Sequence, residues 1–369
     1  MPKSVLLAHI SDVSGHKAAA DAVEKALKII EPSASVLSTN LFNYTNPYSE
    51  RFVNRLYMAI IKRIPQIWEH LYDNPKIVKS TKYAKNLIHK FNAKKIKKLF
   101  DEFKPDVIAC TQAFPCGMFA DFKKIYRLNT PLIAIVTDFL PHSYWLYQNV
   151  DYYSVANEES KNRLIELGVE DKKIKLLGIP INPKFSTSLD KVEIAQRLGL
   201  DVTLPVILVM GGGQGLGPIK KIVESLDGIG VKLQLVIVTG TNTKLYNELR
   251  KMPICNKHFL LSYADNVDEL MEVSSIIVTK PGGLTISEAL AKGVIPVIVN
   301  PIPGQEENNT KYLLKHNSAF RAKNAEDVGV IVENLISDRE KYAIIQQNLK
   351  YIAKPKSAFD IADLILKNA

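Results

Sequence analysis

The stretch Thr279–Thr310, TKPGGLTISEALAKGVIPVIVNPIPGQEENNT, decides the fold that this chain can adopt. An apolar strand at 276–279 enters a glycine pair, a helix follows, and a second strand leads into a polar loop. Strands and helices that alternate in this way predict an α/β domain built on a parallel sheet.

The same stretch offers three kinds of ligand contact. The backbone N–H groups of Gly282 and Gly283, together with the positive end of the following helix, suit phosphates. The carboxylate of Glu288 can accept hydrogen bonds from two ribose hydroxyls, and the Gln, Glu and Asn side chains of the polar loop suit a sugar. The stretch therefore predicts a pocket for a nucleotide that carries a sugar.

Length, composition and charge limit the class of the protein. The 369 residues suit two domains, and 46% hydrophobic with 23% charged residues is typical of globular proteins. The net charge of +10 fits a lysine-rich proteome and an anionic partner, such as membrane lipid or nucleic acid, equally well. Cys110, Cys116 and Cys255 lack metal-ligand spacing and predict reduced thiols of a cytosolic protein.

The chain carries no visible secretory signal, because the apolar run Val5–Ile10 is too short and indicates a buried first strand. No uninterrupted apolar run reaches the roughly 18 residues that a membrane-spanning helix needs. We therefore expect any contact with a membrane to be made from its surface.

The strand–helix pattern of the first half restarts in the second half. Expected strands lie at 4–10, 35–38, 107–111, 132–137 and 152–156, and then at 206–210, 234–239, 259–261 and 276–279. We expect a first domain at 1–183, a linker at 184–204 and a second domain at 205–354. The economical interpretation is two doubly wound domains that face each other across a cleft.

A glycine loop, GGGQGLG at 211–217, follows the first strand of the second half and opens a helix. This is the context that phosphate binding requires, because glycines let backbone N–H groups approach an anion closely. The loop is neither G-x-G-x-x-G nor a Walker sequence, so a tight strand–helix turn without a ligand is the alternative.

Two loops at expected strand ends of the first half carry candidate catalytic residues. His16 closes the loop that joins the first strand to the first helix. A histidine near a helix N-terminus tends to stay neutral because the dipole disfavours the cation, and neutral imidazole can act as a general base. Asp138 at another strand end is the alternative base. His142 and Trp145 follow it, and for these two residues a role in the site and simple packing at a domain edge are equally good interpretations.

Together these motifs resemble a glycosyltransferase family that contains monogalactosyldiacylglycerol synthases and bacterial processive diacylglycerol glucosyltransferases. A more distant resemblance is to MurG-type N-acetylglucosaminyltransferases. The likeness covers nearly the whole chain, and its marks are SGHKAAA at 14–20, TDFxxHxxW at 137–145, GIPI at 178–181, GGGQGLG at 211–217, KPGGLTISEA at 280–289 and PGQEExN at 303–309. The loop at 11–16 departs from the GGTGGH loop of MurG-type enzymes, which favours the diacylglycerol branch.

The resemblance implies a GT-B fold and an inverting transfer of a hexose from UDP-glucose or UDP-galactose to diacylglycerol. The first domain would take the lipid and the second the donor, and a final helix within about 355–369 would return to the first domain. His16 or Asp138 would be the base, and the acceptor side would include Gly15, His142 and Trp145. The implied donor-binding residues are Gly212, Gly213, Gln214, Gly215, Tyr263, Lys280, Gly282, Gly283, Thr285, Glu288, Gln305, Glu306 and Asn309.

No metal site or cofactor is expected, because no carboxylate pair or Asp-x-Asp motif lies near the phosphate loop. The segment 47–104 is the expected membrane face, with apolar and aromatic residues such as Ile64 and Trp68 ahead of lysines that include Lys94 and Lys95. Apolar insertion beside basic residues is how peripheral proteins bind anionic lipid. An ordinary amphipathic helix pair with a solvated face is the alternative.

These features predict a cytoplasmic enzyme, peripheral on the inner face of the cell membrane, that binds anionic lipids and no nucleic acid. Three other functions stay open: transfer to a polyprenyl-linked precursor, a non-catalytic nucleotide-sugar-binding regulator, and a UDP-sugar epimerase. The sequence does not distinguish glucose from galactose, which differ at one hydroxyl.

Overall fold

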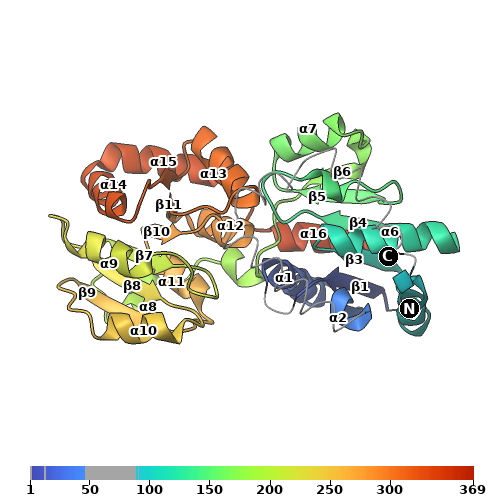
Figure 1. The fold of residues 1–369 in the computed structure, drawn as a ribbon, viewed down its shortest axis with the longest axis horizontal. Coiled ribbons are helices and arrows are strands. Elements are labelled where there is room, and N and C mark those ends of the chain that lie inside the picture. Colours follow the sequence, from blue (N-terminus) through green and yellow to red (C-terminus); the bar gives the residue numbers. More distant parts are fainter. Residues whose placement is uncertain (1, 12–13, 46–88, 90) are drawn as a thin grey trace. The chain divides into compact units, whose positions relative to one another are not determined.

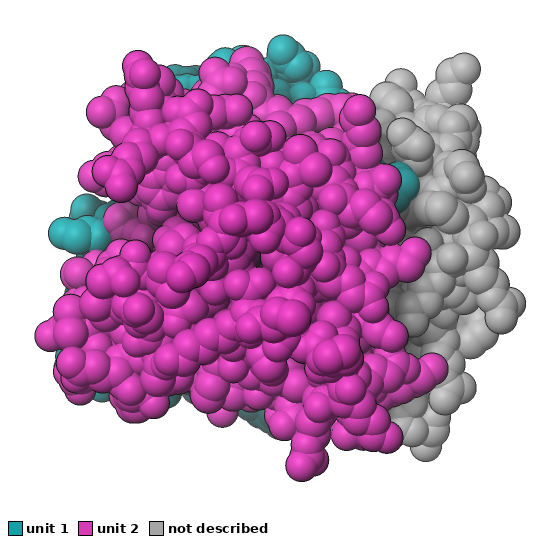
Figure 2. All heavy atoms as spheres, turned by 90° about the vertical axis from the view of Figure 1, so that its left-hand side faces the viewer, with its two compact units in different colours: residues 1–183, 302–305, 356–369 teal, residues 184–301, 306–355 magenta. Residues whose placement is uncertain are grey.

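The computed structural model describes residues 2–11, 14–45, 89 and 91–369. They belong to two compact units: unit 1 comprises residues 1–183, 302–305 and 356–369, and unit 2 comprises residues 184–301 and 306–355. Figure 1 labels the elements, and Figure 2 colours the two units separately. Each unit contains its own six-stranded sheet.

The sheet of unit 1 is entirely parallel. Its strands are β1 (Ser4–His9), β2 (Ser35–Asn40), β3 (Val107–Cys110), β4 (Leu132–Ile135), β5 (Tyr152–Val155) and β6 (Ile174–Leu176). They are arranged in the order β2-β1-β3-β4-β5-β6. β3 and β4 are buried along their whole length, as expected for central strands of a parallel sheet that is covered on both faces.

The strand order of unit 1 reverses between β1 and β3. Ala8 of β1 pairs in register with Cys110 of β3, so the loops after these strands leave the sheet side by side. In open α/β sheets, ligands bind outside the carboxyl ends of the strands at such a reversal. His16 and Thr111 follow these two strands and lie at this edge.

Helices pack on the sheet of unit 1. They are α1 (Gly15–Ile30), α2 (Leu41–Thr45), α6 (Ala113–Tyr126), α7 (Glu158–Glu166) and α16 (Ser357–Asn368), with short 3-10 turns at Ser143–Trp145 and Asp171–Lys173. Residues 91–103 are also helical. The Ser14 hydroxyl caps α1 by accepting a hydrogen bond from the amide of Lys17 at 3.2 Å.

The C-terminal helix α16 packs on α1 within unit 1, which confirms the prediction that the chain returns to its first domain. Small residues make the contact close, since Ala22 and Ala26 of α1 share a core with Ala358 and Ala362 of α16. Ile361 and Ile365 fill the remaining space and are fully buried.

The sheet of unit 2 is parallel as well. Its strands are β7 (Val206–Met210), β8 (Gln234–Val238), β9 (Lys257–Leu261), β10 (Ile276–Thr279), β11 (Ile295–Ile298) and β12 (Phe320–Arg321). The order β12-β11-β10-β7-β8-β9 reverses between β10 and β7. Met210 pairs in register with Thr279, so the glycine loop and the opening of the stretch Thr279–Thr310 leave the sheet side by side.

The helices of unit 2 are α8 (Lys191–Arg197), α9 (Ile219–Asp227), α10 (Thr243–Arg250), α11 (Val267–Val273), α12 (Gly283–Lys292), α13 (Gln305–Lys315), α14 (Glu326–Ser337) and α15 (Arg339–Ile352). The 3-10 turn Pro183–Ser186 spans the boundary between the units, and the first residue of α13 is grouped with unit 1. α12 ends at Gly293, whose φ of 67° gives the left-handed cap that glycine adopts at lowest cost.

The α/β class with two doubly wound sheets is confirmed, but one local prediction is wrong. The residues from Gln305 to Asn309 do not form a polar loop, because they are the first turns of α13. Glu306 and Glu307 lie in its first turn, where their charges interact favourably with the helix dipole. Gly304, with a φ of 89°, provides the turn into the helix.

Most of the predicted membrane face, including Ile64 and Trp68, lies outside the described residues. No helix in the described part of the chain is long and apolar enough to cross a membrane.

Candidate functional site

The glycine loop of unit 2 is a tight turn supported by its neighbours. Gly212 and Gly215 have φ angles of 68° and 57°, and a Cβ on Gly215 would lie 1.9 Å from the carbonyl oxygen of Thr239. The carbonyl of Gly213 accepts a hydrogen bond from the amide of Thr241 at 2.9 Å. No described residue accepts a hydrogen bond from the amides of Gly213 or Gln214, which are exposed. The loop is therefore rigid and presents backbone donors.

A second set of backbone donors begins α12, beside the glycine loop. Gly282 is the N-cap, and it has no side chain that could occupy the first-turn amides of Gly283, Leu284 and Thr285. These residues are half-buried rather than covered. Two adjacent groups of N–H donors at the reversal of the sheet are an arrangement that can bind a diphosphate, which is the predicted role of this edge.

Side chains from α13 support this edge. The Lys280 ammonium lies 2.9 Å from a carboxylate oxygen of Glu306, and both side chains are 16% exposed. Asn309 is buried, and its amide donates to the carbonyl of Pro281 at 3.0 Å. Lys280 and Glu306 thus come together at the mouth of the site, whereas Asn309 holds the turn that precedes α12.

Glu288 lies on the half-buried side of α12. Burial raises the pKa of its carboxyl group to about 8, Lys184 opposes that rise, and Asp268 adds to it. A carboxyl group that is neutral near pH 7 becomes a better hydrogen-bond acceptor when it loses its proton. Glu288 follows the N-terminal amides of α12 by about one turn of the same helix.

Tyr263 lies in the loop between β9 and α11 and is 61% exposed. An exposed ring at this edge can cover a flat heterocycle. This is compatible with the predicted donor-binding role, which stays a prediction.

In unit 1, His16 is held by two residues that sequence reasoning missed. Its Nδ1 lies 3.0 Å from the carbonyl oxygen of Thr111 and 2.9 Å from the hydroxyl of Thr137. A carbonyl oxygen can only accept, so Nδ1 carries the hydrogen and Nε2 carries the free lone pair. The hydroxyl of Thr111 also donates to the carbonyl of His16 at 2.8 Å.

The charge state of His16 agrees with its prediction, although the main cause differs. Burial lowers the pKa of the imidazole to about 4, with a smaller contribution in the same direction from His9. We predicted a neutral imidazole because of the helix dipole, whereas the larger cause in the structure is that burial removes the ring from water. Neutral His16 with Nε2 unprotonated has the form that a general base requires.

Asp138 is buried and accepts a hydrogen bond from the side-chain amide of Gln305 at 3.0 Å; both residues belong to unit 1. Gln305 was predicted on the donor side, so the structure joins it to a candidate catalytic residue. Trp145 is 1% exposed and belongs to the core of unit 1, and His142 packs against Trp145 and Tyr144. This placement favours the packing alternative for Trp145. Gly15 is exposed at the start of α1.

The basic helix at 91–103 carries the described part of the predicted membrane face. Lys94 and Lys95 are both exposed, and the Lys95 ammonium donates to the carbonyl of Thr45. Phe91 is 76% exposed on the same helix. A surface pocket there is lined by Lys94, Lys97, Lys98, Asp101, Glu102 and Tyr126.

The residues missed from the sequence are Thr111, Thr137, Lys184 and Asp268. Thr111 and Thr137 each end an expected strand, and that position was the available signal for proximity to His16. Lys184 and Asp268 are far apart in the chain and lie in no motif, so only their approach in unit 2 reveals them. No group of three or more potential metal ligands occurs among the described residues.

Two parallel doubly wound units, a donor-rich switch point and a returning C-terminal helix define the GT-B class of fold. Solved structures agree over nearly the whole chain. MurG from Acinetobacter baumannii has a TM-score of 0.66 at 14% identity, with 99% of this chain and 100% of that chain covered. HepE from Anabaena in complex with UDP-glucose has a TM-score of 0.55 at 14% identity, with 99% and 100% covered.

The sequence comparisons are more specific. Residues 16–181 match the family model for monogalactosyldiacylglycerol (MGDG) synthase, and residues 206–362 match the glycosyltransferase family 28 C-terminal domain. The processive diacylglycerol beta-glucosyltransferase of Bacillus subtilis (strain 168) is 30% identical over 338 residues, 90% of this chain and 87% of that protein. The enzyme of the same name from Bacillus cereus (strain G9842) is 30% identical over 367 residues, 98% and 92% of the two chains.

The chain therefore belongs to the family of monogalactosyldiacylglycerol synthases and processive diacylglycerol glucosyltransferases.

Proposed function

We propose that this protein is an inverting glycosyltransferase that moves a hexose from UDP-glucose or UDP-galactose to diacylglycerol, giving mono- and in further rounds diglycosyldiacylglycerol. The observation that carries the proposal is the switch point of unit 2. There, the glycine loop and the N-terminus of α12 offer backbone donors beside the Lys280–Glu306 pair and Glu288. Diacylglycerol as the acceptor is supported by the relatives that carry this activity in their names.

In this proposal, unit 2 binds the donor. The backbone N–H groups of Gly213, Gln214 and Gly283 donate hydrogen bonds to the diphosphate, and these bonds strengthen as negative charge develops on the leaving UDP. Glu288 accepts hydrogen bonds from the ribose hydroxyls. When the donor binds, the Lys280 ammonium contacts the diphosphate and its ion pair with Glu306 weakens. The Glu306 carboxylate can then accept hydrogen bonds from the sugar.

Unit 1 supplies the base. His16 Nε2 takes the proton of the acceptor hydroxyl while that oxygen attacks the anomeric carbon and UDP leaves from the opposite face. The Thr111 carbonyl stabilises the resulting imidazolium through the Nδ1–H bond. Asp138 is the second candidate for the base. Its carboxylate accepts a hydrogen bond from Gln305, so its alternative role is to position the Gln305 side chain.

Docking on the cytoplasmic face of the membrane is part of the proposal. Lys94 and the neighbouring lysines of helix 91–103 are exposed beside Phe91, the pairing of basic and apolar groups that anionic lipid surfaces attract. Liposomes that contain anionic lipid should bind the protein more tightly than neutral ones, and added salt should weaken that binding. Equal binding to both liposomes would contradict this part.

The decisive assay combines purified protein, radiolabelled UDP-glucose or UDP-galactose, and liposomes that contain diacylglycerol. Labelled glycolipid from one donor supports the proposal and identifies the hexose. Absence of product from both donors, with UDP bound, would favour the non-catalytic regulator. If product forms with a polyprenyl-linked acceptor and none forms with diacylglycerol, the acceptor is the polyprenyl-linked precursor instead of diacylglycerol.

A substitution separates the base from the donor site. His16→Ala should reduce transfer by about 100- to 10,000-fold, because it removes proton abstraction. UDP affinity should stay close to that of the unchanged protein, as measured by calorimetry. If Asp138→Asn has the larger effect on transfer and His16→Ala the smaller one, the roles of the two residues are reversed.

A further inference from the structure

Three helices of unit 1 begin at the same edge of its sheet. β2, β1 and β3 are adjacent and parallel, so their carboxyl ends lie together, and α2, α1 and α6 follow these ends. The second residue of each helix has a ring: Phe42 in α2, His16 in α1 and Phe114 in α6. The candidate base and two aromatic side chains therefore start from one edge, the edge at which open α/β sheets bind ligands.

The two phenylalanine rings contact each other. Phe42 and Phe114 stack, with 4.5 Å between the ring centroids and 16° between the ring planes. Because β1 lies between β2 and β3 in the sheet, the two rings approach each other from both sides of the strand that leads to His16. Both side chains are half-buried, so the pair keeps apolar surface accessible at this edge.

Phe114 follows closely the group that holds the candidate base. The carbonyl of Thr111 accepts a hydrogen bond from Nδ1 of His16 at 3.0 Å, and Phe114 comes three residues after Thr111. Three residues of chain span at most about 11 Å between Cα atoms. The glycerol and the first acyl methylene groups of a diacylglycerol can cover a distance of that order. An acceptor whose hydroxyl meets Nε2 of His16 can therefore place its ester and acyl groups against the ring pair.

Further contacts hold Phe114 in place. The ring of His89 packs edge-on against it, with 5.4 Å between the ring centroids. The side chain of His89 is 1% exposed, and its Nδ1 lies 2.6 Å from a carboxylate oxygen of Asp121. The amide of Phe114 donates to the side chain of Gln112 at 2.7 Å. The ring pair is therefore preorganised, which lowers the cost of ordering side chains when a ligand binds.

The element that carries Phe42 also adjoins the basic helix at 91–103. The Lys95 ammonium donates to the carbonyl of Thr45, the last residue of α2. Leu41 of α2 shares one buried core with residues of the basic helix and of α6. The helix that is proposed to meet the lipid surface therefore packs together with both elements of the ring pair.

We propose that Phe42 and Phe114 form the surface that receives the glycerol ester and the first acyl methylene groups of the acceptor, between the lipid surface and His16. The inference rests on the proposed function, because a diacylglycerol acceptor is what brings these groups to His16. Methylene groups that contact the ring faces leave water, which is favourable in proportion to the apolar area removed. The rings offer no hydrogen bond, so they favour an alcohol that bears acyl chains over a water-soluble one.

The test measures transfer from the UDP-sugar that the unchanged chain uses to dioctanoylglycerol in non-ionic detergent micelles. These micelles carry no anionic lipid, so the KM for the acceptor does not depend on docking. Phe42→Ala should raise this KM by about 5- to 50-fold, because it removes a ring from the contact. The kcat and the UDP dissociation constant should stay within about 2-fold, since base and donor site are unchanged. Phe42→Tyr keeps the ring and should restore the KM to within about 2-fold.

Two further substitutions extend the test. Phe114→Leu removes the other ring and keeps an apolar side chain against the core, and it should also raise the KM for dioctanoylglycerol. Phe42→Gln replaces the ring by a polar chain that tolerates a half-buried position, which covers the case in which Phe42→Ala is poorly folded. It should raise the KM at least as far as the alanine.

Phe91→Ala and Ile125→Ala are matched controls, because each removes an exposed apolar side chain of unit 1 that is not part of the ring pair. Phe91→Ala should weaken binding to anionic liposomes without diacylglycerol and leave the KM in micelles in place. Phe42→Ala should show the converse, with liposome binding retained and the KM raised. Ile125→Ala should change neither quantity.

A raised KM in Phe42→Ala and Phe114→Leu, with kcat and UDP affinity retained, supports the inference. An unchanged KM in both variants would overturn it, as would a rise of the same size in Ile125→Ala. Loss of kcat together with UDP affinity would also overturn it, because that result indicates a packing role alone. If the unchanged chain makes no glycolipid, the proposed function and the inference are both wrong, whereas glycolipid formed with the same KM in all variants contradicts the inference alone.

Discussion

The imidazole of His16 shows how two strand ends determine the state of one side chain. Nδ1 is fixed by the Thr111 carbonyl and the Thr137 hydroxyl, so Nε2 is the only nitrogen with a free lone pair. Burial keeps the ring neutral, because it lowers the pKa of His16 to about 4. A base at this position stays unprotonated well below neutral pH, at the cost of a smaller driving force for proton transfer.

Thr137→Val tests this arrangement at the scale of a residue. The substitution keeps the shape of the side chain and removes one hydrogen bond, so kcat should fall by about 3- to 10-fold, with little change in UDP affinity. Thr137→Ser, which keeps the hydroxyl, should restore most of the rate. Nitrogen NMR of His16 should show a larger fraction of the other tautomer in Thr137→Val. An unchanged tautomer together with an unchanged kcat would contradict the positioning role.

Glu288→Gln gives a second prediction at this scale, on stability. The folded state raises the pKa of Glu288 from 4.5 to about 8, so between these values the folded protein holds a proton that the unfolded chain releases. The contribution of Glu288 to stability is complete below pH 4.5 and is lost as the pH rises to about 8. Its slope is at most about 1.4 kcal/mol per pH unit. Denaturant unfolding at several pH values should show a flatter dependence in Glu288→Gln, and an identical slope would contradict the burial of the carboxyl group.

The glycine loop belongs to the scale of elements, because its shape depends on the adjacent β8–α10 loop. Gly215 combines a φ of 57° with a position where a Cβ would meet the carbonyl of Thr239, whereas a Cβ on Gly213 would meet nothing within 4 Å. The two glycines therefore have different requirements. The backbone conformation at position 215 requires glycine, whereas the absence of a side chain at Gly213 leaves space where a ligand can approach.

Gly215→Ala and Gly213→Ala form a matched pair for this element. Gly215→Ala should lower the free energy of unfolding by about 2 kcal/mol or more, because it combines left-handed strain with a clash against backbone. Gly213→Ala should leave stability within about 0.5 kcal/mol and weaken UDP binding instead. Thermal unfolding and calorimetry measure the two effects. Equal losses of stability in both variants would contradict the difference in backbone requirement.

At the scale of the whole molecule, the chain completes the core of its first unit with its last helix. Ile361 of α16 is fully buried in one core with residues of α1 and β1, so unit 1 cannot complete its core until α16 has been synthesised. Unit 2 has its own sheet and does not contain α16.

Ile361→Ala should lower the stability of unit 1 by about 2–5 kcal/mol, because it creates a cavity between α16 and the sheet. UDP binding, assigned to unit 2, should be retained at temperatures below the transition of unit 1. Asp363→Ala on the exposed side of α16 is the matched control and should change little. If hydrogen exchange of Ile361→Ala shows loss of amide protection throughout unit 2 as well as unit 1, the two units unfold together and the expectation is wrong.

The sequence by itself determined the α/β class, the repeated strand–helix pattern, the family, and the location of the glycine-rich turns that are the candidate phosphate-binding loops. These follow from local signals, since buried apolar runs predict strands and glycines at strand ends predict turns. The segment from Gln305 to Asn309 was the exception, because polar residues without apolar periodicity are typical of a loop. Its helical state depends on packing in unit 2 and on the turn at Gly304.

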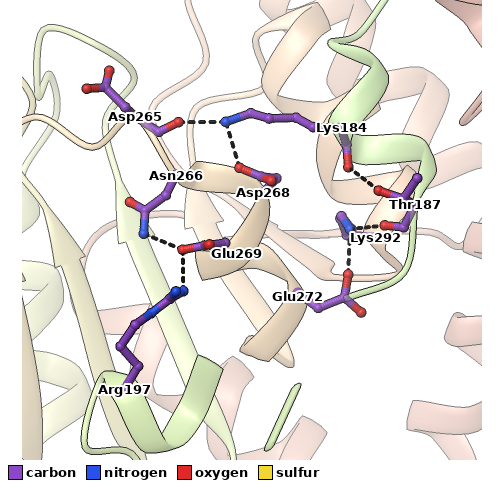
Figure 3. Close-up of polar contacts among 9 residues, drawn as sticks. All are labelled: Lys184, Thr187, Arg197, Asp265, Asn266, Asp268, Glu269, Glu272 and Lys292. Atoms are coloured by element: carbon purple, nitrogen blue, oxygen red, sulfur yellow. Dashed lines mark hydrogen bonds and ion pairs between the residues drawn. The ribbon is translucent and has the colours of Figure 1, made fainter. Parts of the chain in front are cut away.

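Only the tertiary structure decided which groups control the candidate site. Thr137 lies 121 residues from His16 and meets it because β1, β3 and β4 are adjacent in one sheet. Lys184 and Asp268 are far apart in the sequence and form an ion pair because the connecting segment and α11 meet in unit 2 (Figure 3). Charge states are set by burial and by neighbours in space, and neither is encoded in a local motif. The stretch Thr279–Thr310 thus predicts where a nucleotide would bind, and the packing around it determines which of its side chains are buried.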